Sequence, residues 1–300
     1  MDSLLRRLQS RPPPPEAMQP ATRRRPALAA LKWTSAAAVV LGFLRRRAAF
    51  AAQVRWTAAC QACASGSPSS LRAALRRAPR RARRRRAYAA ALLPVAAAAG
   101  SSRCVELLLE WSGDAAALLA CADGDGRTAL HRAALHGRGE AVAALCRAGA
   151  QVSPADGRGV TPLHLACECA RADAQGAESA IYALMGRGAR ADVVDARGLT
   201  PLHYAARAGG AQACRALLAS GAAADTEDAQ GRQPLSHAAE RARAAAALVL
   251  LEAGASPHAS DGKGRTALEW AQAEGISLAD AKLLPRWAEV LRVMSGRAGG

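Results

Sequence analysis

The sequence predicts an all-α repeat protein, an α-solenoid built from stacked helix-turn-helix units. Half of the 300 residues are hydrophobic, yet only five Trp, three Tyr and two Phe are present, and Ala and Leu dominate. This composition suits closely packed helices, whereas a β-sandwich or barrel needs more Val, Ile, Tyr and Phe. In addition, one short motif recurs five times at a nearly constant interval.

The recurring motif has the pattern Asp-x-x-Gly-x-Thr/Gln-Pro/Ala-Leu. Its Thr or Gln stands at positions 128, 161, 200, 233 and 266, so the intervals are 33, 39, 33 and 33 residues. Such regularity indicates an array in which each unit buries its apolar face against its neighbours. The five copies begin Thr128-Ala129-Leu130-His131, Thr161-Pro162-Leu163-His164, Thr200-Pro201-Leu202-His203, Gln233-Pro234-Leu235-Ser236 and Thr266-Ala267-Leu268-Glu269.

Each part of the motif has a physical role in a two-helix unit. The Thr caps a first helix, and the Pro or Ala that follows occupies a position whose N–H needs no helical partner. Small apolar residues then recur at helical spacing, and a Gly at unit position ten, as in Gly137, Gly209 and Gly275, is expected to end this helix in the left-handed conformation. A second helix follows, and Asp and Gly form a tight turn before the next unit.

This pattern resembles the ankyrin repeat. The resemblance implies two antiparallel helices and a protruding β-hairpin finger in each unit, with the units stacked side by side. It also implies that His131, His164 and His203 form structural hydrogen bonds between adjacent units. A protein of this kind is expected to be a non-enzymatic interaction module, a monomeric array that binds a partner protein through its hairpin tips and concave helix face.

The array is expected to extend beyond the five clear units. Residues 91–127 keep the two-helix layout with extra residues around Trp111–Asp114, and residues from about 57 form a degenerate capping repeat. The six extra residues of the unit at 161 are expected in an exposed loop, Arg171–Ala177, and a final unit with Trp270 and Trp287 should close the far end. The expected division is a basic extension at 1–50, a capping repeat with an Arg-rich linker at 51–90, the array at 91–295 and a tail at 296–300.

The formal charge of +17 belongs to one end of the chain. Residues 1–90 carry nineteen Arg and one Lys against two acidic residues, whereas residues 91–300 have a net charge of −1. Residues 1–50 fit three interpretations: a membrane anchor over 27–44, an organelle transit segment, or a partly disordered basic extension. The arginine run at 76–86 suits nuclear import, contact with phosphates, or a solvated linker; without interleaved aromatic residues, nucleic-acid binding would be non-specific.

We therefore expect a cytoplasmic or nuclear protein, with a targeted scaffold or a nucleic-acid tether as alternative functions. The eight cysteines sit in Ala-rich helical contexts and are expected to be reduced. Neither Cys60-x-x-Cys63 nor Cys167-x-Cys169 has a partner pair at zinc-site spacing. No catalytic, metal or cofactor site is expected.

Partner binding is predicted at the variable turn positions, which lie one, two and four residues after each turn Asp. Six of these fifteen residues are basic and one is acidic, which favours an acidic segment of a partner protein. The first helices are expected to extend this face, with Tyr204 and Trp270 as aromatic anchors. The predicted partner-binding residues are Asp125, Arg127, Arg158, Arg197, Arg232, Lys263 and Arg265 on the turns, with Glu168, Tyr204, Arg207 and Glu240 on the helices.

Overall fold

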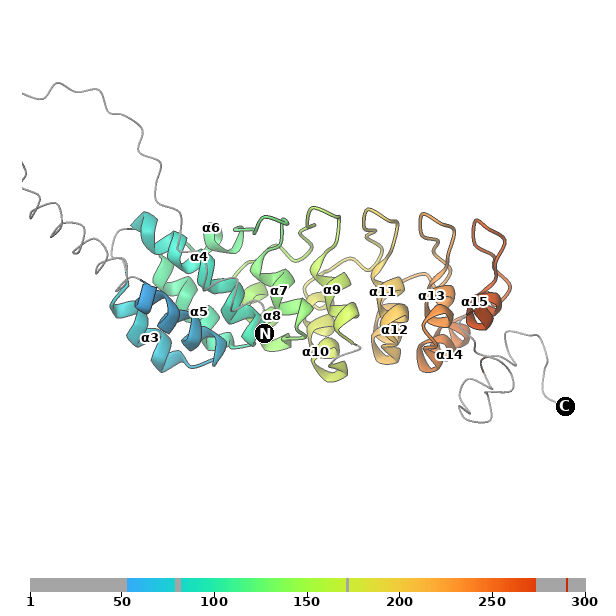
Figure 1. Cartoon of the computed structure of the whole chain (residues 1–300), viewed down its shortest axis with the longest axis horizontal. Coiled ribbons are helices and arrows are strands. Elements are labelled where there is room, and N and C mark those ends of the chain that lie inside the picture. The colour runs from blue at the N-terminus through green and yellow to red at the C-terminus, as the bar shows by residue number, and fades with distance from the viewer. Residues whose placement is uncertain (1–52, 79–81, 171–172, 274–289, 291–300) are drawn as a thin grey trace, which may run out of the picture.

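Pairs of antiparallel helices line up side by side along the long axis of the molecule (Figure 1). The computed structural model describes residues 53–78, 82–170, 173–273 and 290. In the described part of the chain, the first helices of successive pairs (α4, α7, α9, α11, α13, α15) pack on one another, and the second helices (α5, α8, α10, α12, α14) form a parallel row. The helices are α3 (Pro68–Arg76), α4 (Ala82–Ala99), α5 (Ser102–Ser112), α6 (Ala115–Leu119), α7 (Ala129–Leu135), α8 (Gly139–Arg147), α9 (Pro162–Cys169), α10 (Ala174–Met185), α11 (Pro201–Ala208), α12 (Ala211–Ala219), α13 (Pro234–Glu240), α14 (Ala244–Glu252) and α15 (Ala267–Ala273).

The expected helix boundaries are confirmed where the structure describes them. Thr128, Thr161 and Thr200 are N-caps of their helices, and Pro follows at the first position of α9, α11 and α13. Gly137 and Gly209 have φ of 63° and 86°, the left-handed geometry that ends a first helix. Several alanines in the middle of the first helices are fully buried, so their small side chains let adjacent helices approach closely.

The N-terminal end differs from its predicted organisation. Helical residues 53–64 and α3 lie where the capping repeat is expected. However, α4 begins at Ala82, so Arg83–Arg86 are helical and the expected Arg-rich linker is wrong for these residues. Ala and Arg are both strong helix formers, and the apolar second half of α4 packs against α5 and α7, which supports the helix as a whole.

Two insertions are also resolved. The extra residues expected near Trp111–Asp114 precede a short additional helix, α6, which was not predicted. The loop predicted at Arg171–Ala177 is wrong in part, because α10 already begins at Ala174 and has twelve residues, whereas α8 has nine. Asp173 caps α10 by accepting the N–H of Gly176 at 2.8 Å, and buried apolar residues continue the helix face beyond it.

Each unit projects a turn, here called a finger, from the same side of the stack (Figure 1). The fingers are residues 123–127, 156–160, 195–199, 228–232 and 261–265. The expected β-hairpins are not confirmed: the described residues hold two isolated β-bridges, Ala122–Thr128 and Ser260–Thr266, and no longer strand. Residues 1–50 and 296–300, like Gly275 and Trp287, lie outside the described residues. None of the helices that the structure describes combines the length and apolarity needed to span a membrane.

Candidate functional site

An aspartate carboxylate closes each finger, and it is buried in every finger except the first, where Asp123 is exposed. In the second finger, Oδ1 of Asp156 accepts the backbone N–H groups of Arg158 at 2.8 Å and Val160 at 3.0 Å. The other four turn aspartates make the same pair of bonds, to the residues two and four positions later. Burial acts to raise the pKa of Asp156, but these N–H groups and the Arg127 guanidinium outweigh it and hold the pKa below its usual value. The fingers are therefore rigid, charged turns.

The second carboxylate oxygen, Oδ2, binds a different side chain in each finger. It is bound by the residue nine positions later in four fingers: Arg132 (2.6 Å), Tyr204 (2.9 Å), His237 (2.9 Å) and Trp270 (3.2 Å). The equivalent position in the second unit is Leu165, which has no polar group. There, Nε of Arg127 reaches from the preceding finger to Asp156 at 3.1 Å. This relation was not predicted, although the sequence carries a signal for it: a polar or aromatic residue nine positions after the turn Asp.

The fingers are joined to one another through their backbones. The N–H of Gly157 donates to the carbonyl of Asp125 at 2.9 Å, and equivalent bonds link the later fingers. Gly198 shows how closely they approach, because a Cβ built there would lie 2.8 Å from the backbone nitrogen of Ala229 in the next finger. This contact and a φ of 75° both require glycine. The finger tips therefore form one continuous edge.

The predicted basic finger residues fall into two layers. Arg127, Arg232 and Arg265 turn inward and are half-buried: each donates to a turn Asp, and the guanidinium of Arg265 also lies 3.7 Å from the ring centroid of Trp270. Asp125, Arg158, Arg197 and Lys263 lie on the exposed outer edge. The inward arginines are held by carboxylates and half-buried, whereas the outer side chains are exposed, so the outer layer is the more accessible one to a partner.

The predicted residues on the first helices form a connected layer beneath the fingers. Glu168 of α9 accepts from Arg207 of α11 at 3.2 Å, and the guanidinium of Arg207 lies 4.7 Å from the ring centroid of Tyr204. Glu240 accepts from Arg232 at 3.3 Å. Tyr204 is only 3% exposed, and its hydroxyl donates a hydrogen bond to Oδ2 of Asp195 at 2.9 Å. Its expected role as an aromatic anchor is therefore wrong: it positions Asp195 and Arg197 instead.

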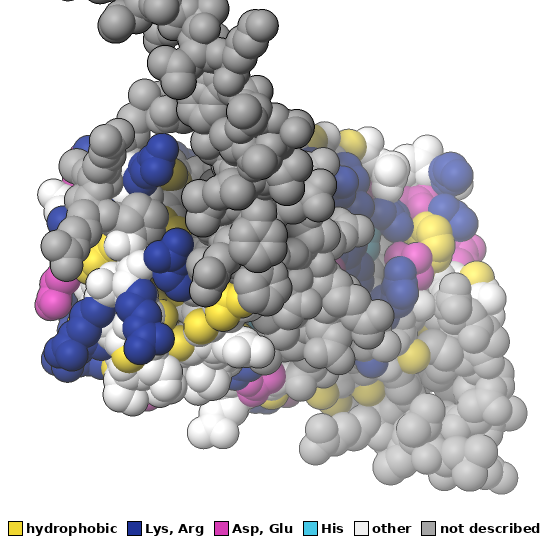
Figure 2. All heavy atoms as spheres, turned by 60° about the vertical axis from the view of Figure 1, so that its left-hand side comes forward, with side chains coloured by type: hydrophobic (Ala, Val, Ile, Leu, Met, Phe, Trp, Pro, Cys, Tyr) yellow, Lys and Arg dark blue, Asp and Glu magenta, His cyan; other side chains and the backbone are white. Residues whose placement is uncertain are grey.

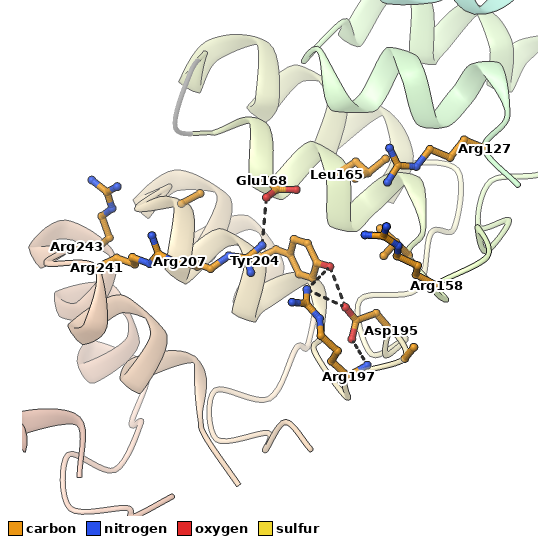
Figure 3. Close-up of a pocket in the computed structure, with 13 residues that line it drawn as sticks. Arg127, Arg158, Leu165, Glu168, Asp195, Arg197, Tyr204, Arg207, Arg241 and Arg243 are labelled. Carbon is orange, nitrogen blue, oxygen red and sulfur yellow. Dashed lines mark hydrogen bonds and ion pairs between the residues drawn. The ribbon is translucent and has the colours of Figure 1, made fainter. Parts of the chain in front are cut away.

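Fingers and first helices together enclose an arginine-rich groove of about 570 Å³ (Figure 3). Arg127 and Arg158 point toward the space beside Leu165, and Arg207 lies between Tyr204 and Arg241 in the same view. Leu165 lines this hollow, at the position where the other fingers have a residue that binds their turn Asp. The charged lining residues are Arg127, Arg158, Arg197, Arg207, Arg241 and Arg243, with Glu168 and Asp195 as the acids.

Arg241 and Arg243 were not predicted, because they follow α13 and lie outside the finger pattern. Arg241 is exposed, and Arg243 packs across Gly209 of the preceding unit, where a Cβ would come within 2.7 Å of its Cδ. The Nε of Arg243 is buried and has no hydrogen-bond partner in the described part of the protein. Lys263, Arg232 and Arg265 lie farther along the stack and do not line the groove.

A family model of ankyrin repeats, three copies long, matches residues 93–175 and 169–261, which together cover more than half of the chain. The chain belongs to the ankyrin repeat family. Ankyrin repeats are in general protein–protein interaction modules and typically non-enzymatic, so a protein partner is the general expectation for this array. No curated protein matches the sequence.

The three repeated histidines are structural in this ankyrin array, as the resemblance implied. Nδ1 of His164 accepts from the backbone N–H of Thr161 at 3.2 Å, and Nε2 donates to the carbonyl of Leu199 in the next unit at 3.0 Å. His131 and His203 make the same contacts. Burial lowers the pKa of all three below the ordinary value, so they are neutral and one ring nitrogen remains an acceptor. No metal-binding group of three His, Cys, Asp or Glu occurs among the described residues.

A second cationic surface covers the N-terminal end of the ankyrin stack. Figure 2 shows Lys and Arg side chains gathered there, and residues 53–99 contain no acidic residue. Arg86 pairs with Asp114 at 2.6 Å, and Arg85 stacks on Trp111 with its guanidinium 4.9 Å from the ring centroid. Within residues 53–99, the exposed arginines of the described part that have no ion pair are Arg55, Arg72, Arg76, Arg77 and Arg84.

Proposed function

We propose that this ankyrin array binds an acidic segment of a partner protein in the arginine groove. The observation that supports the proposal is the charge of the lining: six arginines face two acids in a groove between the fingers and the first helices. Arginine forks bind carboxylates through two parallel hydrogen bonds, and charge complementarity steers association and selects partners. The scarcity of exposed aromatic anchors favours a moderate affinity.

The test compares two triple charge reversals in the full-length chain. The groove variant carries Arg158→Glu, Arg197→Glu and Arg241→Glu. The control carries Arg187→Glu, Arg190→Glu and Arg215→Glu, which are exposed residues outside the groove, so both variants change the net charge equally. The readout is the affinity for a fluorescent octaglutamate peptide. We expect the groove variant to bind at least tenfold more weakly than the control; equal affinities would overturn the proposal.

The acid-free N-terminal surface supports a second candidate function, non-specific contact with nucleic-acid phosphates. Affinity for a 20-base-pair duplex should then fall steeply with salt, the logarithmic slope being about −0.9 per neutralised phosphate. Replacing Arg72, Arg76 and Arg77 with Gln should make this slope less negative, whereas the groove variant should leave it close to that of the control reversal. An unchanged slope in the Arg72, Arg76 and Arg77 variant excludes this surface.

A further inference from the structure

Two arginines from neighbouring fingers, Arg127 and Arg158, point into the same part of the groove, the hollow beside Leu165 (Figure 3). We call them the arginine pair. The two fingers that carry them are joined by the hydrogen bond from the N–H of Gly157 to the carbonyl of Asp125 at 2.9 Å. The backbone therefore fixes the two arginines next to each other at the hollow.

The arginine pair arises because Leu165 cannot bind the turn Asp of its own unit. In the fourth and fifth fingers, the arginine four positions after the turn Asp donates to the Asp of its own finger, as Arg232 does to Asp228. Arg127 occupies the same position in the first finger, yet its Nε donates to Asp156 of the next finger at 3.1 Å. This bond brings the guanidinium of Arg127 across to the second finger.

Both members of the arginine pair keep hydrogen-bond donors for a ligand. Arg158 is exposed, and its guanidinium makes no ion pair within the described part of the chain. Arg127 donates to Asp156 through Nε, and its two Nη groups have no hydrogen-bond acceptor among the described residues. The two acids that line the groove, Glu168 and Asp195, are hydrogen-bonded to other side chains.

A phosphate monoester suits two neighbouring guanidinium groups better than a carboxylate does. A carboxylate has two oxygens, and a single arginine fork can occupy both. A phosphorylated Ser or Thr has three acceptor oxygens and a charge of about −1.5 to −2 at pH 7, so it can accept from both arginines at once. Asp156 already holds Arg127 in place, which reduces the side-chain entropy lost on binding.

We propose that the partner segment carries a phosphorylated serine or threonine whose phosphate binds between Arg127 and Arg158. This inference rests on the proposed function of the groove and adds one phosphorylated residue to the acidic segment. The other arginines that line the groove then receive the carboxylates of the segment, while the arginine pair selects for the phosphate.

The experiment uses three fluorescent peptides that differ at one pair of residues in the middle of an identical Asp-containing sequence. The pair is Ser-Gly in the first peptide, phosphoserine-Gly in the second and Glu-Glu in the third, which matches the charge of the phosphate. Binding to the full-length chain is measured by anisotropy at about pH 7.5, where the phosphate is mostly a dianion. General attraction to the basic N-terminal region contributes similarly to the second and third peptides. We expect the phosphoserine peptide to bind about tenfold more tightly than the Glu-Glu peptide.

Two single substitutions separate the arginine pair from the rest of the groove. Arg158→Gln removes an exposed side chain without an ion pair in the described part of the protein, so the fold should persist, and the preference for phosphoserine over Glu-Glu should disappear. Arg241→Gln is the control, because Arg241 is also exposed and lines the groove away from the arginine pair (Figure 3). It should weaken both peptides by similar factors and keep the preference.

The outcomes distinguish the phosphate site from the groove as a whole. If the wild-type chain binds the phosphoserine and Glu-Glu peptides equally, and both variants bind all three peptides more weakly, the proposed function stands and the phosphate site is overturned. A preference for phosphoserine that persists in Arg158→Gln overturns it as well, because the phosphate then binds elsewhere. If neither variant weakens the binding of any peptide, the proposed function fails too.

Discussion

The hydroxyl of Tyr204 offers a sharp test of how the fingers are stabilised. It donates to Oδ2 of Asp195 at 2.9 Å and accepts from Arg197 at 3.2 Å, and the Asp195 side chain is only 2% exposed. Tyr204→Phe removes this hydroxyl but keeps the ring, whose centroid lies 5.1 Å from that of His164. A hydrogen bond to a charged group contributes about 1.5–3 kcal/mol. Since Asp195 keeps both backbone bonds to Oδ1, we expect a loss of about 2 kcal/mol in the free energy of unfolding.

Urea denaturation, followed by circular dichroism and Trp fluorescence, measures this loss, and Tyr182→Phe is the matched control. Tyr182 is 61% exposed on α10, so its substitution should change the unfolding free energy by less than about 0.5 kcal/mol. Equal effects of the two substitutions would refute the role assigned to the Tyr204 hydroxyl.

The pH dependence of the same substitution tests whether the bond is to a charged group. Burial acts to raise the pKa of Asp195, but the backbone N–H groups of Leu199 and Arg197 and the Tyr204 hydroxyl outweigh it and hold the pKa below its usual value. A carboxylate with a lowered folded pKa stabilises the fold above its unfolded pKa of about 3.9 and loses this contribution as pH falls through the folded value. The difference between wild type and Tyr204→Phe should therefore be largest near pH 7 and shrink below about pH 4. A difference that is constant with pH would contradict a bond to the carboxylate.

Three further predictions follow from single residues. Ala242 has a φ of 56°, so Ala242→Gly should stabilise the protein by about 1 kcal/mol in urea denaturation, whereas Ala148→Gly, at a φ of −76°, should not stabilise it. Burial lowers the pKa of His237 from 6.5 to about 4; the unfolded chain binds more protons between these values, so stability should fall by about 3 kcal/mol from pH 7 to pH 4, and His237→Gln should flatten that slope. Cys121 is half-buried and the other seven cysteines are buried, so iodoacetamide should label Cys121 first in the folded protein by peptide mass spectrometry; simultaneous labelling of all eight would contradict the packing.

The repeat architecture could be predicted from the sequence because its determinants are local. A Thr cap, a following Pro and a Gly at unit position ten each specify the backbone around them, and their recurrence identifies the units. The hydrogen bonds of the three repeated histidines were expected only because the pattern resembles the ankyrin repeat. The layers of the fingers were not predicted, because the variable turn positions were treated as one exposed set. In the structure, the arginines four positions after a turn Asp lie inward, as Arg127 does, whereas the residues two positions after it lie outside, as Arg158 does.

The other features that were not predicted depend on contacts between residues that are distant in sequence or on packing against neighbouring helices. Arg241 and Arg243 are distant in sequence from the fingers that line the groove, and only the stacking of successive units brings them to it. The extension of α10 depends on a cap at Asp173 and on burial against its neighbours. The helical state of Arg83–Arg86 follows from the packing of the apolar half of α4. Local charge and turn patterns carry no information about such partners.

The bond between Arg127 and Asp156 makes one unit depend on the unit that precedes it in the chain. In the other units that the structure describes, the turn Asp finds its partner within its own unit, so such a unit can be duplicated or moved with the side-chain contacts of its turn Asp intact. The unit with Leu165 depends on the arginine of the unit before it. Duplication of that unit alone would place Val160 where Arg127 now stands, and the buried carboxylate of the copy would lose its charged partner. Recombination in this gene is therefore expected to transmit the two units as a pair.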